Sequence, residues 1–204
     1  MLKRIASRPS SLMSHCLIVL TNFAPGRIPE MNMDHITIRT EREADYDAIR
    51  NLVSESFSSA SHTDGDEHNH IDRLRETDEY LPELSLVAVA GGRIVGHVMM
   101  SRINVGGQIA LALAPLAVLP EYQGRGIGSL LVEEAHRLAL AQGYGLSVLL
   151  GHPGYYSRFG YTPASRFGIK APFDVPDEYF MVCPLAAHHP LPSGLVEYSQ
   201  AFRL

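Results

Sequence analysis

Three glycines at alternate positions, Gly124, Gly126 and Gly128, stand directly before a segment with one apolar face. Glycine lets the backbone approach a ligand more closely than residues with side chains allow. Because the segment after them is predicted to be a helix, its unpaired N–H groups and the positive end of its dipole point into the glycine loop. This combination predicts an anion site, most often one for phosphate.

The segments on either side of the loop predict a strand, a crossover helix and a second strand. Before the loop, two glycine pairs separate three apolar stretches, which predicts three antiparallel strands joined by hairpins. These strands are residues 84–90, 94–105 and 109–118, with Gly91-Gly92 and Gly106-Gly107 as the turns. After the loop, one helical face is apolar up to Gly143, and the apolar run at residues 146–150 is typical of a buried parallel strand. The result is a right-handed βαβ crossover that begins in an antiparallel meander.

The remaining segments predict two further helices and several short strands. Residues 35–39 alternate as a half-buried strand does, and Thr40-x-x-Glu43 is the pattern of a capping box. A helix with an apolar face follows, and a second, charged helix covers Glu67 to Thr77. Three short strands are predicted near the C-terminus, at residues 167–169, 180–185 and 196–202. The element order predicts an α+β fold with one central mixed, mostly antiparallel sheet flanked by helices.

The charge and the cysteine content exclude several classes of partner. The formal net charge is −5, and residues 1–29 hold four basic residues and no acid, so the rest of the chain is more acidic still. We therefore expect no nucleic acid and no membrane as partners, and a cationic substrate suits the chain better than an acidic one. Cys16 and Cys183 make no disulfide framework, and the ten histidines lack the spacing of a metal site. We expect no metal and a reducing, cytoplasmic setting.

The first thirty residues carry no identifiable chemistry. A basic start followed by an apolar run at residues 16–20 is similar to a signal peptide, but the run is too short to span a bilayer. The composition is also similar to that of a transit peptide, and two methionines stand just before the first predicted strand. We expect residues 1–33 to be a disordered or non-native extension. Residues 34–187 are then one folded domain, and residues 188–204 are a tail packed on it with a short strand.

Two motifs give the chain a resemblance to a known family. Ala117-Val118-x-Pro120-x-Tyr122 leads into Gln123-x-x-Gly126-x-Gly128, and Tyr156-x-x-x-Gly160-Tyr161 follows about thirty residues later. The first motif resembles the acetyl-CoA signature of the GNAT superfamily of N-acetyltransferases, and the second resembles that family's tyrosine signature. With its run from His152 to Tyr161, the chain looks most like the YhbS-like bacterial branch. The resemblance extends from about residue 36 to residue 185 and includes the element order.

The resemblance implies where acetyl-CoA binds. Its pyrophosphate would lie on the backbone N–H groups of the loop and the first helical turn, at Gly124, Arg125, Gly126, Ile127, Gly128 and Ser129. Gln123 would close the first turn of the loop, and Arg125 is available for a phosphate. In this family the strands before and after the helix splay apart, which implies a slot for the pantetheine arm between residues 109–118 and 146–150. Leu116, Ala117 and Val118 would line this slot, with backbone groups of Leu116 and Val118 offered to the pantetheine amides and the thioester carbonyl.

Tyr156 is the predicted catalytic residue. Acyl transfer to an amine expels a thiolate, and a tyrosine hydroxyl near the sulfur can protonate it as it leaves. Tyr155 is the competitor, but consecutive helical residues point about 100° apart, so only one of the two faces the slot. The four-residue spacing to Gly160 selects Tyr156.

The general base is missing from the position that the resemblance gives it. Many relatives have a glutamate on the strand before the loop, near the positions of Ala114 and Pro115, neither of which accepts a proton. Pro115 also lacks the N–H of a ladder bond, so we expect a bulge where the strand splays. Either the base comes from elsewhere through water, or the substrate arrives already deprotonated. His97, His152 and Glu83 are candidates for the base by rough proximity alone.

The sequence thus predicts an acetyl-CoA-dependent N-acetyltransferase that modifies a primary amine of a small molecule or peptide by direct attack in a ternary complex. A non-catalytic module that binds or senses acyl-CoA, and a transferase of a different acyl group, stay open as alternatives. We expect residues 57–81 and the tail from Pro163 onward to shape the acceptor site, where several acids favour a cationic acceptor. A homodimer is also left open.

Overall fold

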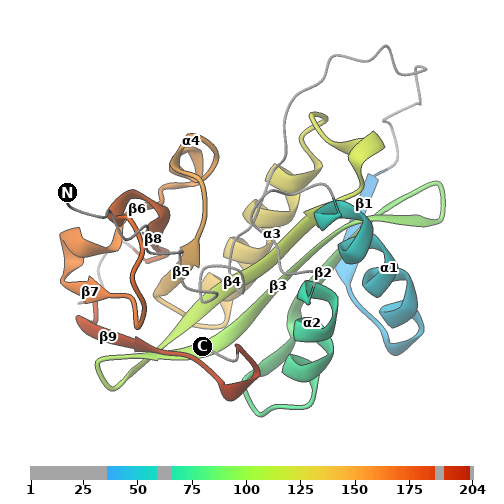
Figure 1. Ribbon diagram of the computed structural model, residues 1–204. Coiled ribbons are helices and arrows are strands. Elements are labelled where there is room, and N and C mark those ends of the chain that lie inside the picture. The colour runs from blue at the N-terminus through green and yellow to red at the C-terminus, as the bar shows by residue number, and fades with distance from the viewer. Residues whose placement is uncertain (1–35, 59–65, 187–190, 203–204) are drawn as a thin grey trace, which may run out of the picture.

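The computed structural model describes residues 36–58, 66–186 and 191–202, which form a mixed sheet with helices on both faces (Figure 1). The extension predicted at residues 1–33 lies outside the described residues. The strands are β1 (Ile36–Thr40), β2 (Tyr80–Ala90), β3 (Arg93–Val105), β4 (Gln108–Val118), β5 (Leu146–Leu150), β6 (Thr162–Pro163), β7 (Ile169–Lys170), β8 (Phe180–Pro184) and β9 (Gly194–Glu197). Their order is β1-β2-β3-β4-β5-β8-β6, and β9 pairs with both β3 and β7. Only β4–β5 and β7–β9 are parallel pairs, so the sheet is mostly antiparallel, as predicted.

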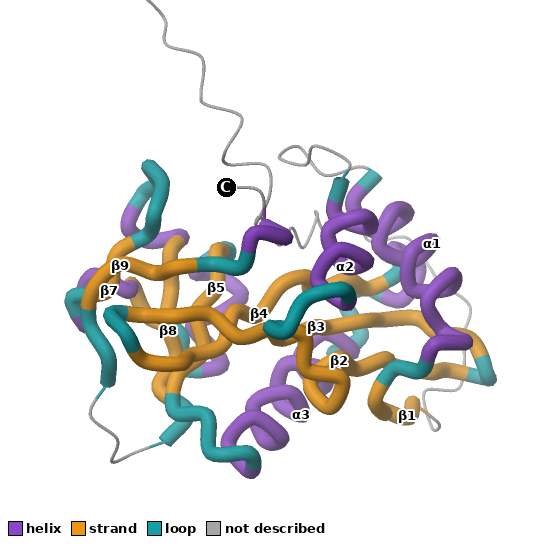
Figure 2. Tube along the Cα trace, turned by 90° about the horizontal axis from the view of Figure 1, so that it is seen from below, coloured by secondary structure: helices purple, strands orange, loops and turns teal. Residues whose placement is uncertain are grey.

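The two faces of the sheet carry different helices. Figure 2 shows α1 and α2 on one face and α3 on the other. The helices are α1 (Tyr46–Phe57), α2 (Glu67–Arg75), α3 (Ile127–Ala141) and the short α4 (Pro153–Tyr156). On β3, a Cβ built on Gly96 would lie about 3 Å from side-chain atoms of Ile127 and Leu131, so Gly96 faces α3. Since side chains alternate along a strand, the neighbouring His97 faces α1 and α2.

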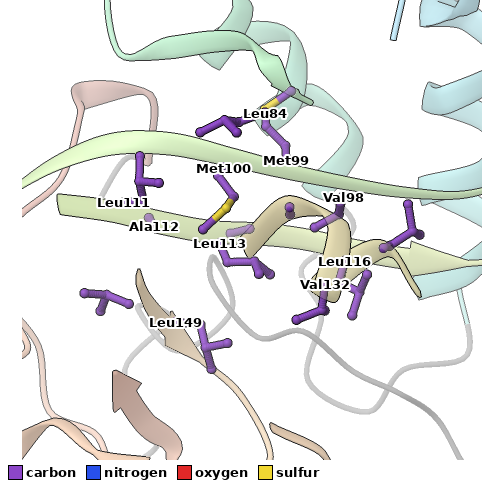
Figure 3. Close-up of a cluster of buried hydrophobic side chains, with 14 of the residues drawn as sticks. Leu84, Val98, Met99, Met100, Leu111, Ala112, Leu113, Leu116, Val132 and Leu149 are labelled. Carbon is purple, nitrogen blue, oxygen red and sulfur yellow. The ribbon is translucent and has the colours of Figure 1, made fainter. Parts of the chain in front are cut away.

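Apolar side chains fill both layers between sheet and helices. Figure 3 shows Leu84 beside Met99 on one side of the sheet, and Val98, Leu116 and Val132 gathered on the other. All five are almost completely shielded from water. Burying an apolar side chain of this size contributes roughly 1.5–3 kcal/mol, so these two layers hold the sheet and its helices together.

Strand β4 changes its pairing halfway along its length. It pairs with β3 over nearly its whole length, but with β5 only at Leu111↔Ser147 and Ala112↔Val148. The register against β3 shifts where Ala114 and Pro115 stand, and the peptide bond between these two residues is cis. The bulge predicted at Pro115 is therefore confirmed, and it lies where β4 and β5 part.

Three local predictions were wrong. Thr40 is the last residue of β1, because it still pairs with Leu86, and it caps no helix. Instead the Asp45 carboxylate accepts a hydrogen bond of 2.8 Å from the Arg42 N–H, which closes a 3-10 turn before α1. Residues 164–167 form a 3-10 turn that ends at a left-handed glycine, so the strand predicted at 167–169 is reduced to β7.

The C-terminal strand is shorter than predicted. Residues 196–202 are predicted to form one strand, but β9 ends at Glu197, and Val196 and Glu197 pair with Val105 and Asn104 of β3. Residues Gln200–Phe202 form a 3-10 turn that packs on α2. The Phe202 ring lies 4.4 Å from the ring of His70, whose Nδ1 is 3.1 Å from the Ala201 carbonyl oxygen.

Two further properties concern the described part of the chain. None of its helices is long and apolar enough to cross a membrane. Nor do three or more of its histidine, cysteine, aspartate or glutamate side chains gather into a group that could hold a metal ion.

Candidate functional site

The glycine loop directs backbone N–H groups toward one point. Gly124 and Gly126 have positive φ angles of 72° and 83°, which glycine adopts without strain. Helix α3 starts at Ile127, and the Leu130 N–H donates to the Gly126 carbonyl at 3.0 Å. The N–H groups of residues 127–129 therefore precede the hydrogen bonds of the helix and are free to bind an anion.

Side chains around the loop fix its shape. The Gln123 amide donates to the Val118 carbonyl at 2.9 Å, which ties the loop back to the end of β4. The Arg125 guanidinium lies 5.6 Å from the centre of the Tyr122 ring and is only partly buried. It therefore places a positive charge beside the N-terminus of α3, where an anion would bind.

Beyond the bulge, alternate residues of β4 direct their backbone groups to opposite edges of the strand. The Leu119 N–H donates to the Val95 carbonyl at 3.0 Å, so Leu119 faces β3. In an antiparallel pair this orientation alternates, so Ala117 also faces β3, while the backbone groups of Leu116 and Val118 point to the opposite edge, toward β5. Since β5 no longer pairs there, these groups line the gap between the two strands.

Tyr156 lies beside the end of β5 and is completely buried. Its hydroxyl has no hydrogen-bond partner among the described residues. The ring edge packs on Gly151 at the end of β5, where an added Cβ would come within 2.5 Å of it. Burial raises the pKa of Tyr156 well above its usual value, so the hydroxyl stays protonated and available as a donor.

Tyr155 points elsewhere, to the N-terminus of α3. A Cβ built on Gly128 would lie 2.5 Å from the Tyr155 hydroxyl, which hydrogen-bonds to Ser129. The Arg158 guanidinium covers the Tyr155 ring at 4.8 Å. The two tyrosines therefore divide between the glycine loop and the gap beside β5.

A second buried group of polar side chains lies behind Tyr156. The Tyr161 hydroxyl is 2.6 Å from the Ser147 hydroxyl and 2.9 Å from the His136 Nε2, and its ring is 5.7 Å from that of Tyr156. Burial lowers the pKa of His136 to about 4, which keeps the imidazole neutral at neutral pH. The sequence motif contains Tyr161 but gave no sign of its partners on α3 and β5.

A third polar cluster, which we call the Glu41 network, lies on the opposite face of the sheet beneath α2. Two N–H groups of Arg75 donate to the Glu41 carboxylate at 2.9 Å each, and the Tyr80 hydroxyl donates to it at 2.6 Å. The His97 Nε2 lies 3.0 Å from the same carboxylate and 3.1 Å from the Ser85 hydroxyl. Burial by itself raises the pKa of Glu41, but hydrogen bonds from His97 and Arg75 outweigh it and hold that pKa well below its usual range.

Sequence reasoning missed all of this network except His97. Glu41, Arg75 and Tyr80 come from three separate elements, and nothing in their spacing brings them together. One signal was available, because His97 and Ser101 place polar groups on the same face of the mostly apolar middle of β3.

The other two candidates for a base are exposed, and neither is joined to a carboxylate. The His152 Nδ1 accepts a hydrogen bond of 3.3 Å from the Gly154 N–H and so caps α4. Glu83 is exposed on β2. Ala114 and Pro115 stand at the bulge of β4, so this position supplies no proton acceptor.

A cleft of about 390 Å³ lies apart from these clusters, between α1 and the β2–β3 hairpin. Arg39, Asp45, Glu55 and Arg93 are among its lining residues. Arg39 and Asp45 pair with each other at 2.6 Å, so these two charges already satisfy one another. None of the residues predicted for cofactor binding or catalysis lines this cleft.

Comparison with known proteins gives a consistent result. The profile of the acetyltransferase (GNAT) family matches residues 46–161, which include the glycine loop and both tyrosines. The chain is 35% identical over 170 residues to YhbS of Escherichia coli, covering 81% of this chain and 97% of the relative. It is 32% identical over 154 residues to YjhQ of Escherichia coli, covering 73% and 82%. Both relatives are named as uncharacterized N-acetyltransferases.

Solved structures show the same fold with a ligand. The crystal structure of Escherichia coli YhbS in complex with CoA matches with a TM-score of 0.76 and 32% identity, over 83% of this chain and 92% of that one. A GNAT acetyltransferase from Brucella melitensis in complex with acetyl-CoA matches with a TM-score of 0.70 and 32% identity, over 82% and 98%.

Proposed function

The chain belongs to the GNAT family of acetyltransferases, and we propose that it transfers the acetyl group of acetyl-CoA directly to a primary amine of a small molecule or peptide. The observation that carries the proposal is the parting of β4 and β5 beside the glycine loop. Close to this point in the chain stand the N–H groups of the first turn of α3, the part of β4 that no longer pairs with β5, and the buried Tyr156 hydroxyl, which has no partner among the described residues. The carbonyl and the sulfur of a thioester would each find a donor there.

The residues present fit the cofactor. Positive-φ glycines leave open space at Gly126, where an added Cβ would meet nothing within 4 Å, so a pyrophosphate can approach the loop. The N–H groups of Gly124 to Ser129 would bind it, with Arg125 for a phosphate and Gln123 holding the loop closed. Backbone groups of Leu116 and Val118 would bind the pantetheine arm. Ala117 would contribute through its side chain, since its backbone faces β3.

When bound, acetyl-CoA supplies an activated acetyl group as a thioester. The Val118 or Leu116 N–H would hold the acetyl carbonyl, and one such positioned donor contributes about 3 kcal/mol to the transition state. The Tyr156 hydroxyl would donate its proton to the sulfur as the carbon–sulfur bond breaks. The partnerless position of this hydroxyl supports the role, because a buried donor without a partner is costly unless a ligand completes it.

The acceptor would approach from the α1–α2 face, opposite α3. Acidic residues are frequent on α2 and the residues around it, such as Asp66, Glu67, Asp72, Glu76 and Asp78. They favour a cationic acceptor, although Asp66 and Asp72 are already paired with arginines. We also propose that the protein acts in the cytoplasm, where acetyl-CoA is available.

A screen for CoA release tests the proposal. Purified protein is mixed with acetyl-CoA and a panel of amines, polyamines, aminoglycosides, amino acids and peptide N-termini, and free thiol is followed over time. We expect at least one primary amine to raise the rate well above background. Tight binding of acetyl-CoA with no release across the panel would favour a non-catalytic sensing module, a reading that the missing carboxylate at Ala114 and Pro115 supports. Faster release from a longer acyl-CoA would identify a different acyl donor.

A further inference from the structure

Transfer to an amine requires a group that removes a proton. An alkyl ammonium ion must lose a proton before its nitrogen can attack a thioester. The bulge of β4 presents Ala114 and Pro115, which cannot accept one. If the proposed function holds, the base must come from another element.

The Glu41 network contains a histidine with one nitrogen held and the other free. The His97 Nε2 lies 3.0 Å from the Glu41 carboxylate, and a carboxylate only accepts hydrogen bonds, so this nitrogen carries the proton. In the neutral ring the lone pair is then on Nδ1. This atom is buried and has no hydrogen-bond partner among the described residues. A histidine oriented by a carboxylate through one nitrogen, with the other left to accept a proton, has the arrangement of a general base.

His97 is also placed beside the reacting part of β4. Its register partner on β4 is Ala117, between the two residues whose backbone groups face the gap. Neighbouring strands are about 4.8 Å apart, so the side chains of His97 and Ala117 lie side by side on the same face of the sheet, where both are buried. This is the face of α1 and α2, from which the acceptor would approach. A water that bridges Nδ1 and an amine at the edge of β4 would carry the proton.

We propose that His97 is the general base of the acetyl transfer, acting through one water, and that Glu41 is its positioning residue. This rests on the proposed function. An acceptor ammonium gives one proton through the water to Nδ1, and the imidazolium that forms is stabilised by the Glu41 carboxylate. The nitrogen then forms a bond to the acetyl carbon, the carbon–sulfur bond breaks, and its electron pair goes to the sulfur.

The protons balance in this sequence. Tyr156 gives a proton to the sulfur and regains one from the attacking nitrogen, which becomes the amide. The proton on His97 passes to solvent, so the net reaction releases one proton. No oxidant, reductant or metal is needed.

The charged groups around His97 are compatible with a ring that gains a positive charge during the reaction. The charged or titratable groups nearest to it are Glu41 after β1, Arg75 on α2 and Tyr80 on β2, while its β4 neighbour Ala117 is apolar. Arg75 also lies 3.7 Å over the Tyr46 ring of α1 and bonds to Asp72 at 3.0 Å. Arg75 neutralises the resting carboxylate, and the bond from His97 to Glu41 offsets the positive charge that the ring gains.

The role of His97 as a base is tested by comparing how His97→Gln acetylates two different nucleophiles. His97→Gln removes the basic nitrogen, and the control Arg137→Gln changes an exposed residue of α3 that pairs with Glu134 on the same helix. For an alkyl amine accepted in the screen, we expect His97→Gln to lower turnover by about 10²-fold or more. Hydroxylamine is uncharged at neutral pH and needs no prior deprotonation, so its acetylation should change far less. Arg137→Gln should leave both rates unchanged.

An equal loss with both nucleophiles would overturn the proposal, because it would show a structural role for His97. If the wild-type protein acetylates no alkyl amine at all, the proposed function itself fails, and the role of His97 fails with it.

A measurement without turnover covers the case in which His97→Gln does not fold. ¹⁵N-histidine NMR of the wild-type protein reports which ring nitrogen carries the proton. We expect the Nε2–H tautomer with an unprotonated Nδ1 for His97. The Nδ1–H tautomer would contradict the proposal, since the free nitrogen would then have no lone pair to offer.

Discussion

The two faces of β4 differ in how their polar groups are assembled. On the side of α3 and β5, the glycine loop, Tyr155 and Tyr156 come from one continuous stretch, residues 116–161. On the side of α1 and α2, the Glu41 network draws its members from four elements spread over 57 positions of the chain, from Glu41 to His97. The α3 side is built from backbone groups and two tyrosines, whereas the α2 side is built from charged side chains.

This difference indicates how the protein would bind its two substrates, acetyl-CoA and the acceptor amine. Backbone N–H groups recognise an anion by geometry, so the same loop can bind the same cofactor in many relatives. Buried side-chain networks depend on the identity of every member, because each lost partner leaves an unsatisfied group. We therefore expect the α3 side to determine the donor and the α2 side to govern the proton and the acceptor.

The largest effect is expected on the α3 side, from Tyr156→Phe. Loss of the hydroxyl removes the proton donor for the sulfur, and turnover should fall by about 10²–10⁴-fold. Affinity for acetyl-CoA, measured by isothermal titration, should stay unchanged because the ring and its packing are kept.

Tyr155→Phe is the matched control, since it removes the same group one residue earlier. Its hydroxyl contacts Ser129 at the glycine loop, so we expect weaker acetyl-CoA binding and little change in maximal turnover. If Tyr155→Phe shows the larger loss of turnover, the two tyrosines have the opposite roles.

On the α2 side, Glu41→Ala should cost about 3–5 kcal/mol of unfolding free energy. The substitution removes the buried carboxylate that Arg75, Tyr80 and His97 share, and it leaves the buried guanidinium with the partly exposed Asp72 as its carboxylate partner. Urea unfolding followed by circular dichroism measures the difference. The comparison is Glu134→Ala, which breaks an equally short arginine–glutamate pair with Arg137 on the surface of α3. We expect no measurable loss there, and similar losses at both positions would mean that burial of the Glu41 network contributes nothing.

A smaller effect concerns pH and the cluster behind Tyr156. Burial lowers the pKa of His136 to about 4 from 6.5, so between these values the unfolded chain binds a proton that the folded chain does not. The free energy of unfolding should therefore fall by about 3 kcal/mol as the pH drops from 6.5 to 4. Glu41 has a lowered pKa, so its own contribution is lost only below about pH 4.5 and does not produce this slope.

Urea unfolding at several pH values measures this loss. His136→Gln should remove it, whereas Tyr161→Phe, which keeps the histidine buried, should retain it. An unchanged slope in His136→Gln would assign the pH dependence to another group.

The sequence predicted the α3 side well because its signals are local. Glycine pairs marked the hairpins, Pro115 marked the bulge, and the loop motif marked the start of α3. The sheet and its mixed pairing followed from the order of these elements. The ends of elements were predicted less well: β1 continues through Thr40 because of its pairing with Leu86, and β9 stops at Glu197, which pairs with Asn104 of β3.

The α2 side could not be predicted because its contacts are made only in the folded chain. Arg75 and Glu41 are 34 residues apart, and no periodicity or spacing links them. His97 was a candidate by position, but only the structure shows that a carboxylate holds its Nε2. Polar residues on the buried face of an apolar strand are the one signal that could have led there.

Isothermal titration of acetyl-CoA with a pair of glycine variants tests the central claim most directly. Gly126 and Gly143 have almost the same φ, 83° and 87°, and an added Cβ would meet nothing within 4 Å at either position. Gly126→Ala and Gly143→Ala therefore impose the same strain at the two ends of α3, but only Gly126 lies in the loop.

The account predicts one-to-one binding by the wild-type protein with a Kd below about 1 mM, clearly weaker binding by Gly126→Ala, and wild-type affinity for Gly143→Ala. No binding by the wild-type protein, or equal affinities for the two variants, would contradict it.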